Sequence, residues 1–267
     1  METTTKDTLT LAAVGDIHCR KESQGAVYPL FAPLQGRVDV VLLCGDLCDY
    51  GTPEEAAILV KEITAAVKAP ILAVLGNHDV ETGMQDEVTN IFTTGGIQVL
   101  NGTAVELFGV GFAGVKGFCG GFGRRTLEPW GEAIVKQFVR EAVDESLKLE
   151  SALAKLRTPQ RVALLHYAPI EATVEGEPKE IYPFLGTSRL EDPLNRYDVA
   201  LAVHGHAHRG TPEGRTRSGV PVYNVSLPLL RRIQPDQCPV RLITIPVVPE
   251  GARYSAPPPV ASAATAS

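Results

Sequence analysis

The sequence lacks any long apolar run and any segment typical of a secretory signal. No hydrophobic stretch approaches the roughly 18 residues that a membrane-spanning helix needs. Residues 1–8 are polar and have neither the basic region nor the apolar region of a signal peptide. We therefore predict a cytoplasmic protein that does not interact with a membrane.

An excess of positive charge is also missing. The chain has 25 lysines and arginines against 31 aspartates and glutamates, for a net charge of -6. This balance provides no general field that would attract a polyanion such as a nucleic acid backbone. We therefore expect no nucleic acid partner.

Cysteine is scarce and irregularly spaced. The five cysteines are an odd number without a repeated spacing, which argues against a disulfide framework. Cys44 and Cys48 lie close together, but a structural zinc site normally needs four ligands in paired clusters, and no second pair exists. We predict that both are small apolar filler at the end of a strand, with zinc binding as the weaker alternative.

The composition is that of an ordinary globular protein. Of the 267 residues, 44% are hydrophobic and 21% are charged. We predict one domain over residues 1–254. Residues 255–267 are rich in proline, alanine and serine, and this composition predicts a disordered tail.

The first third of the chain has the pattern of a βαβ unit. Residues 9–14, 39–44 and 70–75 are nearly continuous apolar runs, which is typical of strands buried on both faces. Between the last two runs, Thr52, Pro53 and Glu55 form the capping pattern of a helix start. We predict a parallel sheet with right-handed crossovers.

The remaining pattern predicts a second sheet and a long helix. Residues 85–92 predict a short helix, and residues 97–115 predict two or three strands separated by glycines. Residues 130–156 have apolar side chains at helical spacing, which predicts an amphipathic helix that covers a sheet or binds a partner helix. Further strands are predicted at 161–165, 199–203, 220–225 and 241–247.

Five short segments contain metal-binding residue types, and nearly all follow a predicted strand. They include every histidine except His204. The segments are Gly15-Asp16-Ile17-His18, Gly45-Asp46-Leu47-Cys48-Asp49-Tyr50-Gly51, Gly76-Asn77-His78-Asp79, Leu165-His166 and Gly205-His206-Ala207-His208. Open parallel sheets bind ligands at one strand-end edge, so distant segments can meet there.

This mixture of ligands suits a pair of metal ions. Carboxylates can bridge two hard metals, and imidazole and amide groups complete the coordination. Two such metals about 3.5 to 4 Å apart activate a shared hydroxide and neutralise phosphoryl oxygens, which favours phosphoester hydrolysis. Taken singly, Asp16 or Asp46 is more typical of a helix N-cap or a turn residue than of a metal ligand. His206 and His208 are expected to point the same way if their segment is extended.

Together and in this order, the five segments resemble the motifs of the calcineurin-like metallophosphoesterase superfamily. They match its Asp-x-His, Gly-Asp-x-x-Asp-x-Gly, Gly-Asn-His-Asp/Glu, lone His and Gly-His-x-His motifs, and the resemblance extends from about residue 9 to residue 225. It implies an α/β fold, a four-layer α/β/β/α sandwich of two mixed sheets flanked by helices. The resemblance also implies a dinuclear metal site at the strand C-terminal ends.

The resemblance further implies a role for each site residue. The first metal would be bound by Asp16, His18, Asp46 and His208, and the second by Asp46, Asn77, His166 and His206. Asp46 would therefore bridge two divalent or trivalent ions, whether manganese, iron or zinc. His78 would lie beside the metals and stabilise charge on phosphorus or protonate the leaving oxygen, with Asp79 orienting its ring.

Other polar residues have two interpretations each. Asp49 either supports a ligand or caps the turn before Thr52, and its presence with His18 argues against the purple acid phosphatase branch, which has a tyrosine at that position. We expect His204 to be a buried strand histidine hydrogen-bonded to the backbone. Three arginines in candidate substrate loops would contact phosphate or be solvated on the surface: Arg124, Arg125 and Arg189.

The predicted function is hydrolysis of small phosphodiesters, including cyclic nucleotides, by attack of a metal-bridging hydroxide. The compact chain resembles the bacterial phosphodiesterase branch of the superfamily, so a small phosphoester is the expected partner. A phosphomonoesterase or protein phosphatase is the alternative enzyme. A non-catalytic metal-binding scaffold is less favoured because all seven implied ligands are present. The sequence leaves open whether the protein forms a homodimer.

Overall fold

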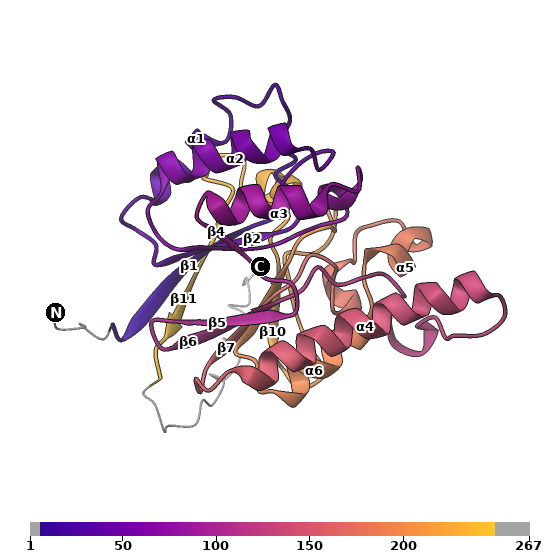
Figure 1. The fold of residues 1–267 in the computed structure, drawn as a ribbon. Coiled ribbons are helices and arrows are strands. Elements are labelled where there is room, and N and C mark those ends of the chain that lie inside the picture. The colour runs from indigo at the N-terminus through magenta and orange to yellow at the C-terminus, as the bar shows by residue number, and fades with distance from the viewer. Residues whose placement is uncertain (1–5, 249–267) are drawn as a thin grey trace, which may run out of the picture.

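The computed structural model describes residues 6–248, which form two packed sheets with helices on both outer faces (Figure 1). The first sheet has the order β11 (Arg241–Pro246), β1 (Thr8–Val14), β2 (Val40–Cys44), β3 (Ile71–Val74), β4 (Ile97–Val99). The second has the order β5 (Thr103–Leu107), β6 (Val110–Gly114), β7 (Arg161–Leu164), β8 (Leu201–His204), β10 (Pro221–Asn224), β9 (Glu213–Arg215). The expected four-layer α/β/β/α sandwich is confirmed.

The helices divide between the two faces. The α-helices are α1 (Tyr28–Phe31), α2 (Pro53–Ala66), α3 (Gln85–Thr94), α4 (Ala133–Lys155), α5 (Tyr182–Leu185), α6 (Glu191–Arg196) and α7 (Leu227–Ile233). The 3-10 helices are η1 (Ala32–Leu34), η2 (His78–Val80), η3 (Gly123–Arg125), η4 (Glu171–Thr173), η5 (Lys179–Ile181) and η6 (Ser188–Leu190). Figure 1 shows α1, α2 and α3 over the first sheet and α4 and α6 over the second.

The predicted βαβ unit is present. Strands β1, β2, β3 and β4 pair in parallel, whereas β11 pairs antiparallel with β1. Helix α2 has the expected capping box, since the Thr52 side chain accepts from the Glu55 backbone N–H and the Glu55 side chain accepts from that of Thr52. This reciprocal cap satisfies two backbone donors at the helix start and fixes the turn that follows β2.

Alternation along the strands divides the core into layers. Leu11 and Leu42 pack between the sheets with Phe112 and Leu164. The sequence neighbours of Leu11 and Leu42 face outward into a second cluster under α2 and α3. Those of Phe112 and Leu164 face the opposite way, into a third cluster under α4. Because successive strand residues point to opposite faces, both faces of each sheet are buried.

Helix α4 is sheet cover, as the first alternative predicted. It begins at Ala133 rather than at residue 130, and it packs Leu149 and Leu153 onto the second sheet. Within residues 6–248 no helix combines the length and the apolar character that crossing a membrane requires. The predicted tail, 255–267, lies outside the described residues, and the boundary at 254 remains a prediction.

The cysteines behave as small apolar residues. Cys44 and Cys48 are fully buried in two different apolar clusters, and all five cysteines are free thiols. No group of metal-compatible side chains within the described part of the chain includes a cysteine. The filler interpretation of this pair is therefore favoured over zinc binding.

Candidate metal centre

The predicted ligands lie where five strands end. Asp16 follows β1, Asp46 follows β2, and Asn77 follows β3 in the first sheet. His166 follows β7, and His206 and His208 follow β8, in the second sheet. Since β1, β2 and β3 are neighbours and β7 pairs with β8, the packing of the two sheets brings these ends together.

The side chains form two groups that meet at Asp46. Ligand atoms of Asp16, His18 and His208 lie within 4.8 Å of one another, as do those of Asp46, His166 and His206. An Asp46 carboxylate oxygen lies 3.8 Å from His18 Nε2, and the other lies 3.4 Å from His166 Nε2. Asp46 therefore stands between the groups, in the position that a bridging carboxylate requires.

Asn77 belongs to the second group. Its Oδ1 lies 2.9 Å from His166 Nε2. The other nitrogen of that ring, Nδ1, donates to the carbonyl oxygen of Cys44 at 2.9 Å. In the neutral ring the Nε2 lone pair then faces two oxygens, those of Asn77 and Asp46, with no proton between them. A cation would satisfy all three atoms.

His18 also has the environment of a metal ligand. Both of its ring nitrogens are buried and have no hydrogen-bond partner among the described residues. Its Nδ1 lies 3.1 Å from an Asp49 carboxylate oxygen but makes no hydrogen bond with it. Buried polar atoms without partners are rare, and an unplaced ion is one of the usual reasons. The residues present therefore fit a pair of metal ions.

The surroundings lower the pKa values of two proposed ligands, Asp16 and His206. Burial opposes ionisation of Asp16, but a hydrogen bond from His208 and the nearby histidines prevail and lower its pKa to about 2. Burial lowers the pKa of His206 to about 3. At neutral pH, Asp16 is thus an anion and His206 a neutral imidazole. These are the protonation states in which each can bind a metal.

Four of the proposed ligands have a left-handed backbone. The φ angles are 57° at Asp16, 49° at His18, 49° at Asp46 and 69° at His206. Non-glycine residues adopt this region at a cost of about 1–3 kcal/mol each, and such residues concentrate at functional sites. Backbone hydrogen bonds hold the turns, since Asp16 N–H donates to Gly45 O and His18 N–H to Asp46 O.

The pair His206 and His208 differs from the prediction. An extended segment would have pointed both rings the same way, but the left-handed φ at His206 breaks the extension. The two rings therefore enter different groups, His208 beside Asp16 at 3.1 Å and His206 beside His166, with 4.8 Å between ring centres. The assignment of the two histidines to different metals remains a prediction.

His78 lies against the centre. Its ring centre is 4.6 Å from that of His18, and its backbone N–H donates to Asp46 Oδ1 at 2.9 Å. His18, Asp46 and His78 form a third group with ligand atoms within 4.8 Å of one another. The geometry therefore permits either a catalytic role or direct metal binding for His78.

The expected role of Asp79 is wrong in this structure. The His78 ring is oriented by Asp49, whose backbone carbonyl oxygen accepts from Nδ1 at 2.7 Å. Asp79 is fully buried and accepts from the backbone N–H groups of Leu47, Cys48 and Gly76. Residues 78 and 79 are consecutive in the 3-10 helix η2, so their side chains diverge by about a third of a turn.

Asp79 instead ties two motif loops together. Its carboxylate joins the loop after β2 to the loop after β3 through these three backbone donors. Burial and the charge of Asp46 raise the pKa of Asp79 to about 6. The residue therefore positions the backbone from which Asp46 and His78 project.

The structure decides between the alternatives for two other residues. The Asp49 carboxylate contacts His18 and Arg20, the latter at 2.7 Å, whereas Glu55 holds the turn before Thr52. Asp49 thus contacts the proposed ligand His18 and does not act as a cap. His204 is buried, with Nδ1 2.7 Å from Gly205 O and Nε2 2.8 Å from the Thr173 hydroxyl, so the expected backbone contact is confirmed.

The three candidate arginines have different surroundings. Arg124 and Arg125 are exposed, whereas Arg189 donates to the backbone of Leu127 and contacts Glu128. Two residues that the sequence interpretation missed contact the proposed ligand His206. The carbonyl oxygen of Phe184 lies 3.1 Å from His206 Nε2, and the Tyr167 ring centre lies 4.5 Å from that of His206. No sequence motif marks either residue.

A test of this packing is the substitution Gly76→Ala. The added methyl would lie 2.1 Å from Asp46 Oδ1 and 2.3 Å from the Asp46 backbone nitrogen, so Asp46 must move. We expect lower metal content and a loss of about 1–3 kcal/mol in the free energy of unfolding, measured in urea.

Gly36→Ala is the matched control for Gly76→Ala. Gly36 has a φ of +73°, and a methyl group added there would meet no atom within 4 Å, so only backbone strain is added. Wild-type metal content in Gly76→Ala would contradict the close approach.

Comparison with known proteins gives the same family that the sequence motifs resemble. The calcineurin-like phosphoesterase family matches residues 9–210. A probable glycerophosphodiester phosphodiesterase, GpdQ, of Arcobacter nitrofigilis is 25% identical over 177 residues, which are 66% of this chain and 59% of that protein. The chain thus spans less than two thirds of the length of that relative.

Solved structures share the fold at low sequence identity. Phosphopantetheinyl hydrolase from Mycobacterium tuberculosis has a TM-score of 0.64 at 16% identity, covering 88% of this chain and 95% of that one. TT1561 of Thermus thermophilus has a TM-score of 0.53 at 15% identity, covering 90% and 100%. GAP50, described as the anchor in the inner membrane complex of Plasmodium, has a TM-score of 0.53 at 14% identity, covering 84% and 73%.

The family match covers all five motif segments, and it includes every residue of the two ligand groups. We conclude that this chain belongs to the calcineurin-like phosphoesterase family.

Proposed function

We propose that this protein is a metal-dependent phosphodiesterase that hydrolyses small phosphodiesters. The observation that carries the proposal is the position of the Asp46 carboxylate between two groups of ligands. A single ion would need only one group, whereas a bridging carboxylate is the usual feature of a two-metal hydrolase.

The ligands divide as two sets that share Asp46. Asp16, His18, Asp46 and His208 would hold one ion, and Asp46, Asn77, His166 and His206 would hold the other. Bound metals supply an activated water and neutralise the phosphoryl oxygens. Manganese, iron and zinc all suit this mixture of carboxylate, imidazole and amide ligands.

The remaining chemistry is assigned to His78. Its ring lies beside His18 and is fixed through Nδ1 by the Asp49 carbonyl, which leaves Nε2 for the substrate. From there it would donate a proton to the leaving oxygen or stabilise charge on phosphorus. Asp79 acts on the reaction only through the loops that it holds together.

Small diesters are favoured over larger substrates. The relative from Arcobacter nitrofigilis is named for a glycerophosphodiester substrate, and the net charge of -6 does not favour a nucleic acid. Cyclic nucleotides belong to the same class. A scaffold role, as the description of GAP50 as an anchor suggests for that protein, is less favoured here because both ligand groups are complete.

The proposal predicts a preference for diesters. Stripped protein, reloaded separately with manganese, iron and zinc, should hydrolyse bis-nitrophenyl phosphate with a higher kcat/KM than nitrophenyl phosphate, and should cleave at least one cyclic nucleotide. Both model substrates release nitrophenolate, so the comparison isolates the second ester arm. Monoester cleavage at least about tenfold more efficient, with no diester cleaved, would overturn the diesterase assignment and leave the two-metal hydrolase assignment standing.

A further inference from the structure

The backbone around His206 forms a strained turn. The N–H of Ala207 donates to the carbonyl oxygen of Gly205 at 2.8 Å, which closes a three-residue γ-turn with His206 at its centre. The φ of 69° at His206 is that of the classic form of this turn, which is rare and strained. Such strain persists only where the surrounding structure holds the backbone in place.

Contact with the end of β1 holds one side of the turn. The backbone N–H of His206 donates to both carboxylate oxygens of Asp16, at 3.0 and 2.9 Å. Gly205 lies so near this carboxylate that an added methyl group would be 2.4 Å from Asp16 Oδ2. The N–H of the peptide that joins Gly205 to His206 is therefore fixed by a proposed ligand of the first metal.

His204 holds the carbonyl oxygen of the same peptide. Its Nδ1 lies 2.7 Å from the Gly205 carbonyl oxygen, and its Nε2 lies 2.8 Å from the Thr173 hydroxyl. A carbonyl oxygen only accepts, so Nδ1 carries the proton of the neutral ring and the hydroxyl donates to Nε2. His204 and Thr173 are both fully buried, so bulk water does not compete for either contact.

A second buried side chain joins Thr173 to the turn. Asn224 Nδ2 donates to the Thr173 carbonyl oxygen at 3.3 Å and to the Ala207 carbonyl oxygen at 2.8 Å. Thr173 ends η4, His204 ends β8 and Asn224 ends β10, so three elements meet around the turn. The surroundings thus provide the support that the strained backbone requires.

We propose that His204, held by Thr173, is a positioning residue for the metal centre. By fixing the Gly205 carbonyl oxygen it keeps the γ-turn closed, and the turn sends His206 and His208 to different ligand groups. The inference rests on the proposed two-metal function. Without this contact the turn would relax toward an ordinary conformation, and the two rings would no longer be held where two ions need them.

The test measures Mn²⁺ binding to stripped protein by equilibrium dialysis and elemental analysis. The amide nitrogen of an asparagine can take the place of Nδ1, and that of a glutamine the place of Nε2. In His204→Gln, the half-saturating Mn²⁺ concentration should rise about tenfold, the lower end of the range for loss of a group that supports a metal ligand. In His204→Asn, which loses only the Thr173 contact, it should rise by about threefold at most.

Thr173 provides a substitution outside the turn, in case the His204 variants fold poorly. Thr173→Val keeps the shape of the side chain but removes the hydroxyl, so His204 Nε2 loses its partner. Thr173→Ser keeps the hydroxyl. The half-saturating Mn²⁺ concentration should rise about threefold in Thr173→Val and stay at the wild-type value in Thr173→Ser.

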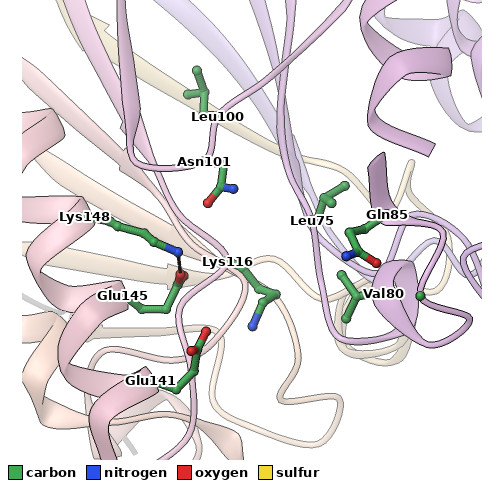
Figure 2. A pocket seen from close by; sticks show the side chains of 10 residues that line it. Leu75, Val80, Gln85, Leu100, Asn101, Lys116, Glu141, Glu145 and Lys148 are labelled. Atoms are coloured by element: carbon green, nitrogen blue, oxygen red, sulfur yellow. Dashed lines mark hydrogen bonds and ion pairs between the residues drawn. The ribbon is translucent and has the colours of Figure 1, made fainter. Parts of the chain in front are cut away.

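Lys148→Met is the control for loss of stability alone. Lys148 pairs with the buried Glu145 at 2.6 Å, and Figure 2 shows this pair on α4. Removing the partner of a buried carboxylate should lower the Tm of the metal-free protein, as the His204 substitutions also should, but it should leave Mn²⁺ binding unchanged.

The outcomes separate the two proposals. Fewer than two Mn²⁺ ions per chain in saturated wild-type protein would overturn the two-metal function and the role of His204 with it. Two bound ions without diester hydrolysis would overturn the proposed reaction and leave the role of His204 to be decided by Mn²⁺ binding. Wild-type Mn²⁺ binding in His204→Gln, or equal losses in His204→Gln and His204→Asn, would overturn the positioning role alone.

Discussion

Asp46→Asn is expected to be nearly inactive, with kcat/KM lowered by more than about a hundredfold. This exceeds the 10–100-fold loss that is usual when a group supporting a metal ligand is removed. Asp46 is 1% exposed and stands between the two ligand groups, so its charge would offset the two proposed cations. We also expect metal content to fall from two ions per chain to one or fewer, measured by elemental analysis of the purified protein.

Asp46→Asn removes the charge of the side chain and keeps its shape. Asparagine keeps an oxygen that can accept from the His78 backbone N–H, so the fold should survive, and thermal unfolding checks this. Asp236→Asn, at an exposed position beyond α7, is the matched control. Full metal loading together with full activity in Asp46→Asn would rule out the bridging role.

His78→Ala should lower kcat by about 10²–10⁴, the range expected for loss of a general acid or base. Metal content should stay near that of the wild type. The structure makes this test necessary, because His18, Asp46 and His78 are close enough to share an ion. A variant that loses metal as well as activity would show that His78 is a ligand.

The choice of substrate then separates the two catalytic roles of His78. If the ring protonates the leaving oxygen, nitrophenyl esters should be affected much less than alkyl esters, since nitrophenolate leaves without a proton. If the ring stabilises charge on phosphorus, both kinds of ester should lose activity equally. The same enzyme preparation serves for both measurements, so differences in metal loading cancel.

Local signals in the sequence were sufficient for most of the architecture. Continuous apolar runs identified β1, β2 and β3 because strands buried on both faces need apolar side chains at every position. Thr52 and Glu55 identified the start of α2 because a capping box depends only on neighbouring residues. Short elements such as α1 and β9 were not predicted, since three or four residues carry little periodicity.

The ligand residues were predicted from their types and order, but their arrangement depends on tertiary contacts. The left-handed turn at His206 sends His206 and His208 to different groups, and no local pattern predicts such a turn at a histidine. Asp79 was expected to orient its neighbour His78, yet its carboxylate is held by backbone donors from the loop after β2. Those donors come from a segment far from Asp79 in the chain, so only the tertiary fold could reveal them.

The sequence by itself determined the family, the two-sheet architecture and which residues are candidates for the centre, because motifs and apolar periodicity are local properties. Only the tertiary structure decided that Asp46 stands between two ligand groups and that Asp49 orients the His78 ring. These features arise where loops from two sheets meet, and the packing of the sheets sets the distances between them.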